Sequence, residues 1–395
     1  YGHAVRLEPS YGWAHNGLGL AQKTLNLPKE ALLSFKRATK FQPDEVWHWY
    51  NLAEMLLELR QYQEALDAAT EATRVNPEHA PSWGKLGQVL RYLKRHDEAL
   101  KAYDRAVEIQ PDYAWALNGR GIVLEQLERY EEALDSYTRA GTISGDDVWY
   151  WYNQGNVLTL MGRYEDALLL LRRAVEIDPS HQRSWARLGN VMRHLNRLEE
   201  AVAAFDRATH IDPSYAWAWN ELGIALDRLG KDEAALIAFR NATDAAPHDP
   251  IYLHQQVDML ITLGKFGEAL RLLEDAIKFD ARNPRSWAKH GQVLRRLNRL
   301  DEALHSYTRA VEIDPLYSWA WNGRGLTLAA LNKHEEALAC FRKATELDTD
   351  DLWYWYNQGD ELVTTGRFRE ATEPLEHALK INPNHAESWA KLGQA

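Results

Sequence analysis

The sequence predicts an all-α protein built from tandem helix pairs. Three observations carry this prediction. A 34-residue internal repeat runs the length of the 395-residue chain, alanine and glycine recur at fixed places in the repeat, and the composition is 45% hydrophobic and 26% charged with few β-branched runs. A repeat of this length with small residues at fixed places is typical of stacked helix pairs, because small residues let two helices approach closely.

Three sequence motifs alternate along the chain and define the repeat. "SWGKLGQVLR" at 82 returns in similar form at 184, 286 and 388, which is a spacing of 102 residues. "YAWALNGRG" at 113 and "DDVWYWYNQG" at 146 recur with the same spacing, and the three motifs interleave every 34 residues. Counted from Gly12, the frame gives eleven units without insertion, 12–385. We expect 1–11 to end a preceding unit and 386–395 to begin a twelfth.

The first helix of each unit is predicted to have two different faces. At about 100° per residue, positions 4, 7, 8 and 11 share one face, and positions 2, 5, 6, 9, 12 and 13 share the opposite one. Nine of the sixteen tryptophans stand at position 4 and seven at position 2, and position 8 is glycine in nine units. We expect the position-4 rings in the core, with the glycine giving room to the ring or to a neighbouring helix, and the position-2 face lining a groove.

The turn, the second helix and the connection follow in the same frame. Position 15 is Gly or Asn in eight units, and these residues tolerate the left-handed backbone that ends a helix. Positions 20 and 27 are alanine in all eleven units, and position 32 is proline in eight, where it ends the second helix. Two departures stand out. Unit 250–283 has Leu253, Gln256 and Val257 at positions 4, 7 and 8, and Pro374 is expected to bend or locally unwind a second helix.

This pattern resembles the tetratricopeptide-repeat family. "WGKLG" at 83, "EALKAYDRA" at 98 and Pro111 show the family pattern within one unit, and the resemblance covers essentially the whole chain. It implies a right-handed α-solenoid whose inner wall is made mainly by the first helices. It also implies binding of peptides or extended protein segments.

The predicted groove carries aromatic, amide and basic side chains. Trp and Tyr are favoured as binding anchors, Asn can pair with any backbone amide, and Arg or Lys suits acidic segments. For the position-2 tryptophans, packing across the seam between units is an equally open interpretation. The predicted groove residues are Trp13, Asn16, Trp47, Tyr50, Asn51, Lys85, Gln88, Arg91, Trp115, Asn118, Trp149, Tyr152, Asn153, Arg187, Asn190, Arg193, Trp217, Asn220, Lys289, Gln292, Arg295, Trp319, Asn322, Trp353, Tyr356 and Asn357.

Composition argues against several function classes. The formal net charge of −11 disfavours a dedicated nucleic-acid binder, and no apolar run is long enough for a membrane span. The single cysteine, Cys340, cannot form an intramolecular disulfide, which fits a cytoplasmic location. No phosphate-binding loop, metal motif or paired-cysteine site is present, and "GRG" at 119 and 323 lies within a predicted first helix. We therefore expect no catalysis, cofactor or metal.

Two functional hypotheses remain, with a third behind them. The chain is an interaction scaffold that holds an extended peptide or protein surface, with acidic stretches favoured. Alternatively, it is the sensor or autoinhibitory part of a larger signalling protein, such as a nucleotidase-type switch or a caspase-like protease. Single-stranded nucleic acid on an aromatic and basic groove is physically possible but disfavoured by the charge.

Overall fold

The computed structural model describes residues 1–395 and contains 24 α-helices and no strand. In every unit the first helix, called helix A, begins at position 1 of the frame and spans 13 residues, except the shorter last one. The short α1 (Gly2–Leu7) precedes them. The A helices are α2 (Gly12–Thr24), α4 (Val46–Glu58), α6 (Ala80–Tyr92), α8 (Ala114–Gln126), α10 (Val148–Leu160), α12 (Gln182–His194), α14 (Ala216–Arg228), α16 (Pro250–Thr262), α18 (Pro284–Arg296), α20 (Ser318–Ala330), α22 (Leu352–Thr364) and α24 (Ala386–Leu392).

The second helices, called B helices, span 14 residues in all eleven complete units, and each is followed by a short connection to the next A helix. They are α3 (Pro28–Phe41), α5 (Tyr62–Val75), α7 (His96–Ile109), α9 (Tyr130–Ile143), α11 (Tyr164–Ile177), α13 (Leu198–Ile211), α15 (Asp232–Ala245), α17 (Phe266–Phe279), α19 (Leu300–Ile313), α21 (His334–Leu347) and α23 (Phe368–Ile381). The unwinding expected at Pro374 is wrong, because α23 continues through that residue with the same length as the other B helices.

The turn between helices A and B has a left-handed residue at position 15 in all eleven units. Eight of these residues are the Gly or Asn expected from sequence. The other three are Arg60, Lys94 and Glu128, with φ of 58°, 59° and 58°. A side chain in this backbone region costs roughly 1–2 kcal/mol, so the turn geometry is imposed by the packing of the two helices.

In ten of the eleven units the core is built around one large side chain at position 24 of helix B, and in unit 46–79 this position is Ala69. Tyr103, Tyr137, Phe205, Tyr307 and Phe341 are among the largest fully buried side chains. A Cβ added at any position-8 glycine would stand 2.5 to 3.0 Å from this side chain in its own unit. The glycine therefore makes room for the B-helix ring rather than for the tryptophan. Burial of one such side chain contributes roughly 1.5–3 kcal/mol.

The position-4 tryptophans take a different place from the fully buried core that we expected. Eight of them are only partly buried, and Trp389 in the last helix is 55% exposed. Every one of the nine donates its indole N–H to the backbone carbonyl six residues earlier, over 2.7 to 3.0 Å. These rings thus fasten each A helix to the connection that precedes it.

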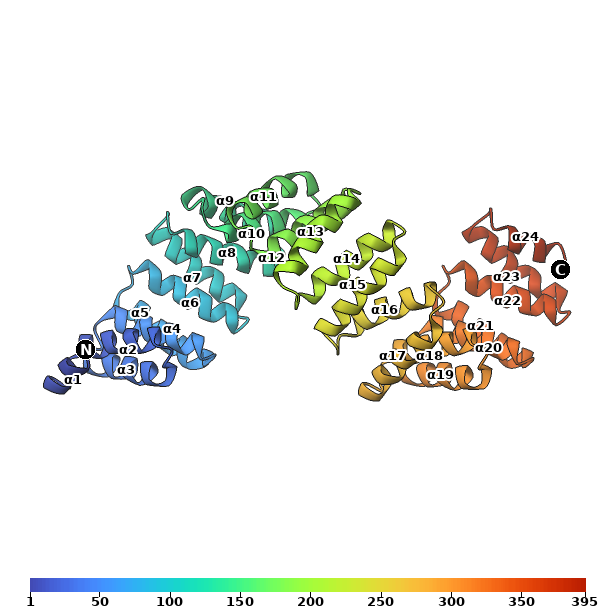
Figure 1. Cartoon of the computed structure of the whole chain (residues 1–395), viewed down its shortest axis with the longest axis horizontal. Helices are drawn as coiled ribbons and strands as arrows, with labels where there is room; N and C mark the ends of the chain where they lie inside the picture. The colour runs from blue at the N-terminus through green and yellow to red at the C-terminus, as the bar shows by residue number, and fades with distance from the viewer. The chain divides into compact units, whose positions relative to one another are not determined.

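The chain divides into two compact parts, which we call the N-terminal part (1–212) and the C-terminal part (213–395). Within each of them, helix pairs follow one another as a solenoid, and A helices contact A helices of neighbouring repeats, as α6 contacts α8 and α18 contacts α20 (Figure 1). Within each of these two parts, the A helices therefore form a wall that carries the predicted groove residues. Continuity of one array across residues 212–213 stays a prediction.

Candidate functional site

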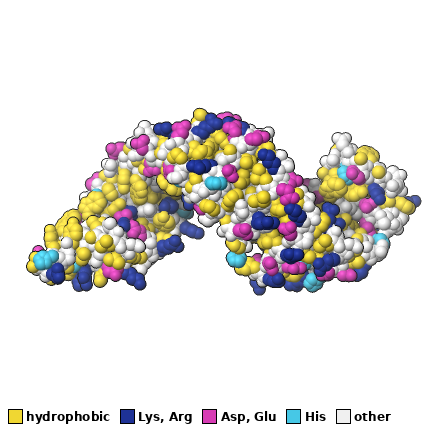
Figure 2. Space-filling model, in the orientation of Figure 1, with side chains coloured by type: hydrophobic (Ala, Val, Ile, Leu, Met, Phe, Trp, Pro, Cys, Tyr) yellow, Lys and Arg dark blue, Asp and Glu magenta, His cyan; other side chains and the backbone are white.

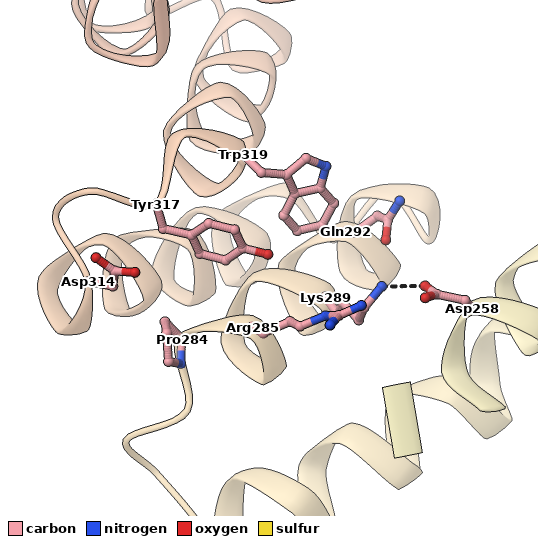
Figure 3. A pocket seen from close by; sticks show the side chains of 8 residues that line it. All are labelled: Asp258, Pro284, Arg285, Lys289, Gln292, Asp314, Tyr317 and Trp319. Carbon is pink, nitrogen blue, oxygen red and sulfur yellow. Dashed lines mark hydrogen bonds and ion pairs between the residues drawn. The ribbon is translucent and has the colours of Figure 1, made fainter. Parts of the chain in front are cut away.

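A pocket of about 520 Å³ opens on the A-helix wall of the C-terminal part (213–395), and we call it the α18 pocket. Three predicted groove residues line it: Lys289 and Gln292 from α18, and Trp319 from the start of α20. Figure 3 shows the Trp319 ring facing α18, beside Gln292 and Lys289. The remaining lining residues are Asp258, Pro284, Arg285, Asp314 and Tyr317. The structure thus brings three of the predicted groove residues together at this place.

Only one of the two cationic side chains that line the α18 pocket forms an ion pair. Lys289 is buried and forms an ion pair with Asp258, while its ammonium lies 5.9 Å from the centre of the Trp319 ring (Figure 3). Arg285 is exposed and makes no ion pair. Sequence reasoning missed Arg285 and Tyr317, although both had a signal. Arg285 stands at position 2, like the groove tryptophans, and Tyr317 is the tyrosine that opens the "YSW" motif.

A buried histidine stands behind this pocket. His254 is 2% exposed and its Nε2 lies 3.1 Å from the Ser286 hydroxyl oxygen. Burial lowers the pKa of His254 to about 4, and the positive charges of Arg285 and Lys289 act in the same direction. The imidazole is therefore neutral at physiological pH and keeps a polar bond within the helix layer.

The N-terminal part (1–212) holds a related arrangement around Lys85. This lysine is buried, and its ammonium lies 5.0 Å from the Tyr50 ring and 5.4 Å from the Trp115 ring, which are typical cation–π distances. Its Nζ also donates to Gln88 over 3.2 Å. Burial lowers the pKa of Lys85. The predicted basic residue is thus held by aromatic groove residues from the two neighbouring repeats.

Three aromatic clusters repeat along the chain where the "WYWYN" motif stands. In the one that contains Trp149 and Tyr152, the two rings meet edge to face at 5.8 Å, and both contact the imidazole of His181. The equivalent clusters are Trp47, Tyr50 and His79, and Trp353, Tyr356 and His385. The histidines precede the "SW" helices and were missed, although their spacing was visible in the sequence.

The position-2 tryptophans both pack and remain accessible. Trp13 contacts His48 of the next repeat at 5.0 Å and is 41% exposed, and the ring of Trp149 is likewise 41% exposed. Trp115 lies against Tyr103 of the preceding repeat. The seam-packing interpretation therefore holds for these rings, and their role in binding stays a prediction.

The predicted asparagines pair with one another across repeats. Asn51 donates to Asn16 over 3.0 Å, and Asn153 donates to Asn118 over 2.8 Å. Asn357 donates to Asn322 over 2.9 Å. Each pair uses one donor and one acceptor, so it keeps three N–H groups and one carbonyl oxygen for other partners.

The remaining predicted residues lie on the same wall with structural partners. Burial raises the pKa of the Tyr103 hydroxyl and the guanidinium of Arg91 acts in the opposite direction, and Arg295 has the same effect on the pKa of Tyr307. Five further predicted residues are buried or partly buried. The predicted residues in this group are Arg187, Asn190, Arg193, Trp217 and Asn220.

Neither a single-sign charge stripe on the face drawn in Figure 2 nor a metal cluster is found. In the view of Figure 2, basic and acidic side chains are interspersed rather than gathered into one stripe. No group of three or more His, Cys, Asp or Glu side chains is arranged to hold a metal ion. None of the helices combines the length and the hydropathy that crossing a lipid bilayer demands.

Comparison with known proteins identifies the repeat. Tetratricopeptide-repeat models match residues 34–67, 78–144, 152–216, 212–250, 255–318, 288–351 and 354–385. No curated protein sequence matches the chain.

Solved structures with similar helix pairs include three repeat proteins. One is YrrB, described as a TPR protein with an unusual peptide-binding site, with 28% identity over 48% of this chain and 97% of YrrB, and a TM-score of 0.41. The APC/C hetero-tetramer Cut9-Hcn1 has 15% identity over 99% of this chain and 90% of its own, with a TM-score of 0.47. Yeast Tom70 has 15% identity over 98% and 95%, with a TM-score of 0.46.

Proposed function

The chain belongs to the tetratricopeptide-repeat family, and from this premise we propose that it is a protein-interaction scaffold that binds an extended partner segment along its A-helix wall. The observation that carries the proposal is the α18 pocket, where an aromatic wall, an amide and an unpaired cation meet on one concave surface. This combination is what an extended peptide needs, because rings anchor side chains and polar groups fix the backbone.

Each group in the α18 pocket has a separate part in this proposal. Trp319 and Tyr317 offer flat apolar surface, and Gln292 offers both a donor and an acceptor for a peptide amide. Lys289 is already neutralised by Asp258, so it orients the wall rather than attracting a ligand. Arg285 is the cation that remains for a carboxylate, and its planar guanidinium suits a bidentate bond. The proposed partner segment therefore carries an acidic residue beside an apolar one.

The test places a photoreactive benzoylphenylalanine at Gln292 and captures partners from native lysate. The matched control carries the same residue at Glu346 on the exposed side of helix B. A protein that crosslinks at position 292 and is lost in the Arg285→Glu variant supports the proposal. Equal crosslinking at both positions, or crosslinking unaffected by Arg285→Glu, contradicts it. Circular dichroism of both variants confirms that the helices are intact.

A further inference from the structure

Position 4 of the repeat is a built site for an indole ring, and the chain fills it in almost every unit. Nine tryptophans occupy it and bond to the carbonyl six residues earlier. In the first repeat (12–45) His15 replaces tryptophan, and its Nε2 lies 2.9 Å from the Pro9 carbonyl oxygen. The geometry of the site is thus the same whichever ring occupies it.

Repeat 8 (250–283) lacks this ring. Leu253 stands at position 4, and no side chain donates to the Pro247 carbonyl six residues earlier. A second pocket, of about 350 Å³, lies at this place, between the connection at Pro247 and the helices α16 and α17. We call it the repeat-8 pocket. Its volume falls within the roughly 300–1,000 Å³ typical of ligand sites.

The walls of the repeat-8 pocket match the surroundings of the tryptophans elsewhere. Asp275, at position 26, lines it, and in repeat 11 the residue at position 26 is His377, which stacks on Trp355 at 4.3 Å. Ala276, at position 27, also lines it. Ala276 is the only one of the eleven position-27 alanines that is not fully or almost fully buried. Ala276 is thus partly uncovered in the repeat where position 4 carries no ring.

The repeat-8 pocket is open for two local reasons. Val257 replaces the position-8 glycine, and α16 packs less closely against α17 than the helices of the other pairs pack against each other. The following repeat also has only Ser286 at position 3. In repeat 4, where Leu117 likewise replaces tryptophan, the position-3 residue of the next repeat is Tyr150, which packs against Leu117 and fills the space.

The rim of the repeat-8 pocket is acidic. Asp244, Asp249, Asp275 and Asp280 line it, and Lys278 pairs with Asp275 on the exposed side. Asp249 and Asp280 each accept a backbone N–H through one carboxylate oxygen. Four carboxylates against one lysine attract a positively charged group. The apolar lining residues are Leu253, Leu272 and Phe279, and the imidazole of His248 stacks on the Phe279 ring at 3.9 Å.

We propose that the repeat-8 pocket binds an indole ring supplied from outside the chain and carried by a cationic group. The ring occupies the place of the missing tryptophan, its N–H donates to the Pro247 carbonyl, and the attached cation meets the aspartates of the rim. The proposal is independent of the function proposed for the A-helix wall, because the two pockets share no lining residue.

The probe is tryptamine, titrated into the full chain by isothermal calorimetry. We expect saturable binding of one molecule per chain. Indole-3-propionate, which carries the opposite charge, is expected to bind at least about fivefold more weakly. Absence of tryptamine binding up to about 1 mM overturns the proposal, and equal affinity for the anion overturns the part assigned to the aspartates.

Two variants decide whether the binding occurs at the repeat-8 pocket. Leu253→Trp refills the site from within, so it is expected to abolish tryptamine binding while the thermal midpoint stays the same or rises. The control Leu169→Trp adds a tryptophan at a position that is 67% exposed on α11, and it is expected to bind as the parent does. Unchanged binding in a folded Leu253→Trp variant overturns the proposal.

A third arm separates the two sources of such a ring. The peptide acetyl-Lys-Trp-Lys-amide presents the same ring and charge as part of a polypeptide. Binding as tight as that of tryptamine, and lost in Leu253→Trp, assigns the pocket to a tryptophan of a basic partner segment. Peptide binding more than about tenfold weaker assigns it to a free indolylalkylamine.

Discussion

Repeat 8 (α16 and α17) and repeat 11 (α22 and α23, 352–385) stand 102 residues apart in the C-terminal part of the chain. The helix pair of repeat 8 is open toward a pocket, whereas that of repeat 11 is closed. In repeat 11, Trp355 covers the helix pair and Gly359 lets helix B approach to where a Cβ would stand 2.6 Å from Leu375. In repeat 8, Leu253 and Val257 replace both residues, and the pair is looser. The difference teaches that a helix pair opens where the ring and the glycine are both missing, since repeat 2 with Ala53 at position 8 and repeat 4 with Leu117 at position 4 each lack only one of them and stay closed.

The largest effect is expected from a charge placed at position 27. Ala378→Arg in repeat 11 forces a guanidinium into a position that is fully buried, and we expect a loss of at least about 4 kcal/mol. Ala276→Arg in repeat 8 can extend into the pocket toward its aspartates, so the expected loss is less than half of this. Urea denaturation of both variants measures the difference. Equal losses would show that repeat 8 is as closed as repeat 11.

The residue at position 5 is expected to make the stability of repeat 8, but not that of repeat 11, depend on pH. The pKa of His254 is lowered to about 4 in the folded chain, against an ordinary value of 6.5. Above pH 6.5 the imidazole is neutral whether folded or not. As pH falls from 6.5 toward 4, only the unfolded chain takes up the proton, so repeat 8 loses up to about 3 kcal/mol of stability.

The variant His254→Gln isolates this contribution from the titration of carboxylates. Thermal midpoints are compared at about pH 7 and about pH 4.5. We expect the parent to lose more stability than the variant between these two conditions. Parallel losses in both proteins would rule out His254 as the source. Tyr356, which occupies position 5 in repeat 11, does not titrate in this range, so Tyr356→Phe is the matched control.

A methyl group at position 8 tests the role of the glycine. In Gly359→Ala the new Cβ meets the side chain of Leu375, and we expect overpacking to cost roughly 1–3 kcal/mol. The partner change Val257→Ala in repeat 8 meets no such contact and is expected to draw α16 and α17 closer. Hydrogen exchange of the two helix pairs reports both effects. A Gly359→Ala variant with parent-like exchange in α22 and α23 would contradict the account of closure.

The smallest effect is expected from the indole hydrogen bond alone. Trp355→Phe keeps an aromatic ring but removes the N–H that donates to the Thr349 carbonyl over 2.9 Å. We expect a loss of about 1 kcal/mol, measured as a lower urea midpoint. The indole N–H of Trp353, at the exposed position 2, makes no such intramolecular hydrogen bond, so Trp353→Phe serves as the control. A larger loss for Trp353→Phe would reverse the assigned roles of the two positions.

The sequence by itself determined the helices and their register, because the repeat is periodic and most helix ends are marked locally by glycine, asparagine or proline. Each A helix begins at the predicted position, and all eleven turns are left-handed at position 15. The family also followed from the sequence, since its pattern recurs in nearly every unit. The wheel placed Lys289, Gln292 and Trp319 on one wall, where they line the α18 pocket.

Only the tertiary structure decided what the polar and aromatic side chains do on that wall. It paired Asn51 with Asn16 and Lys289 with Asp258, and it turned the position-4 indoles toward the connections. It also left the space beside Leu253 open while Tyr150 filled the space beside Leu117. The physical reason is that periodicity fixes the face on which a residue lies, whereas its partner is set by the size and shape of side chains in the next repeat.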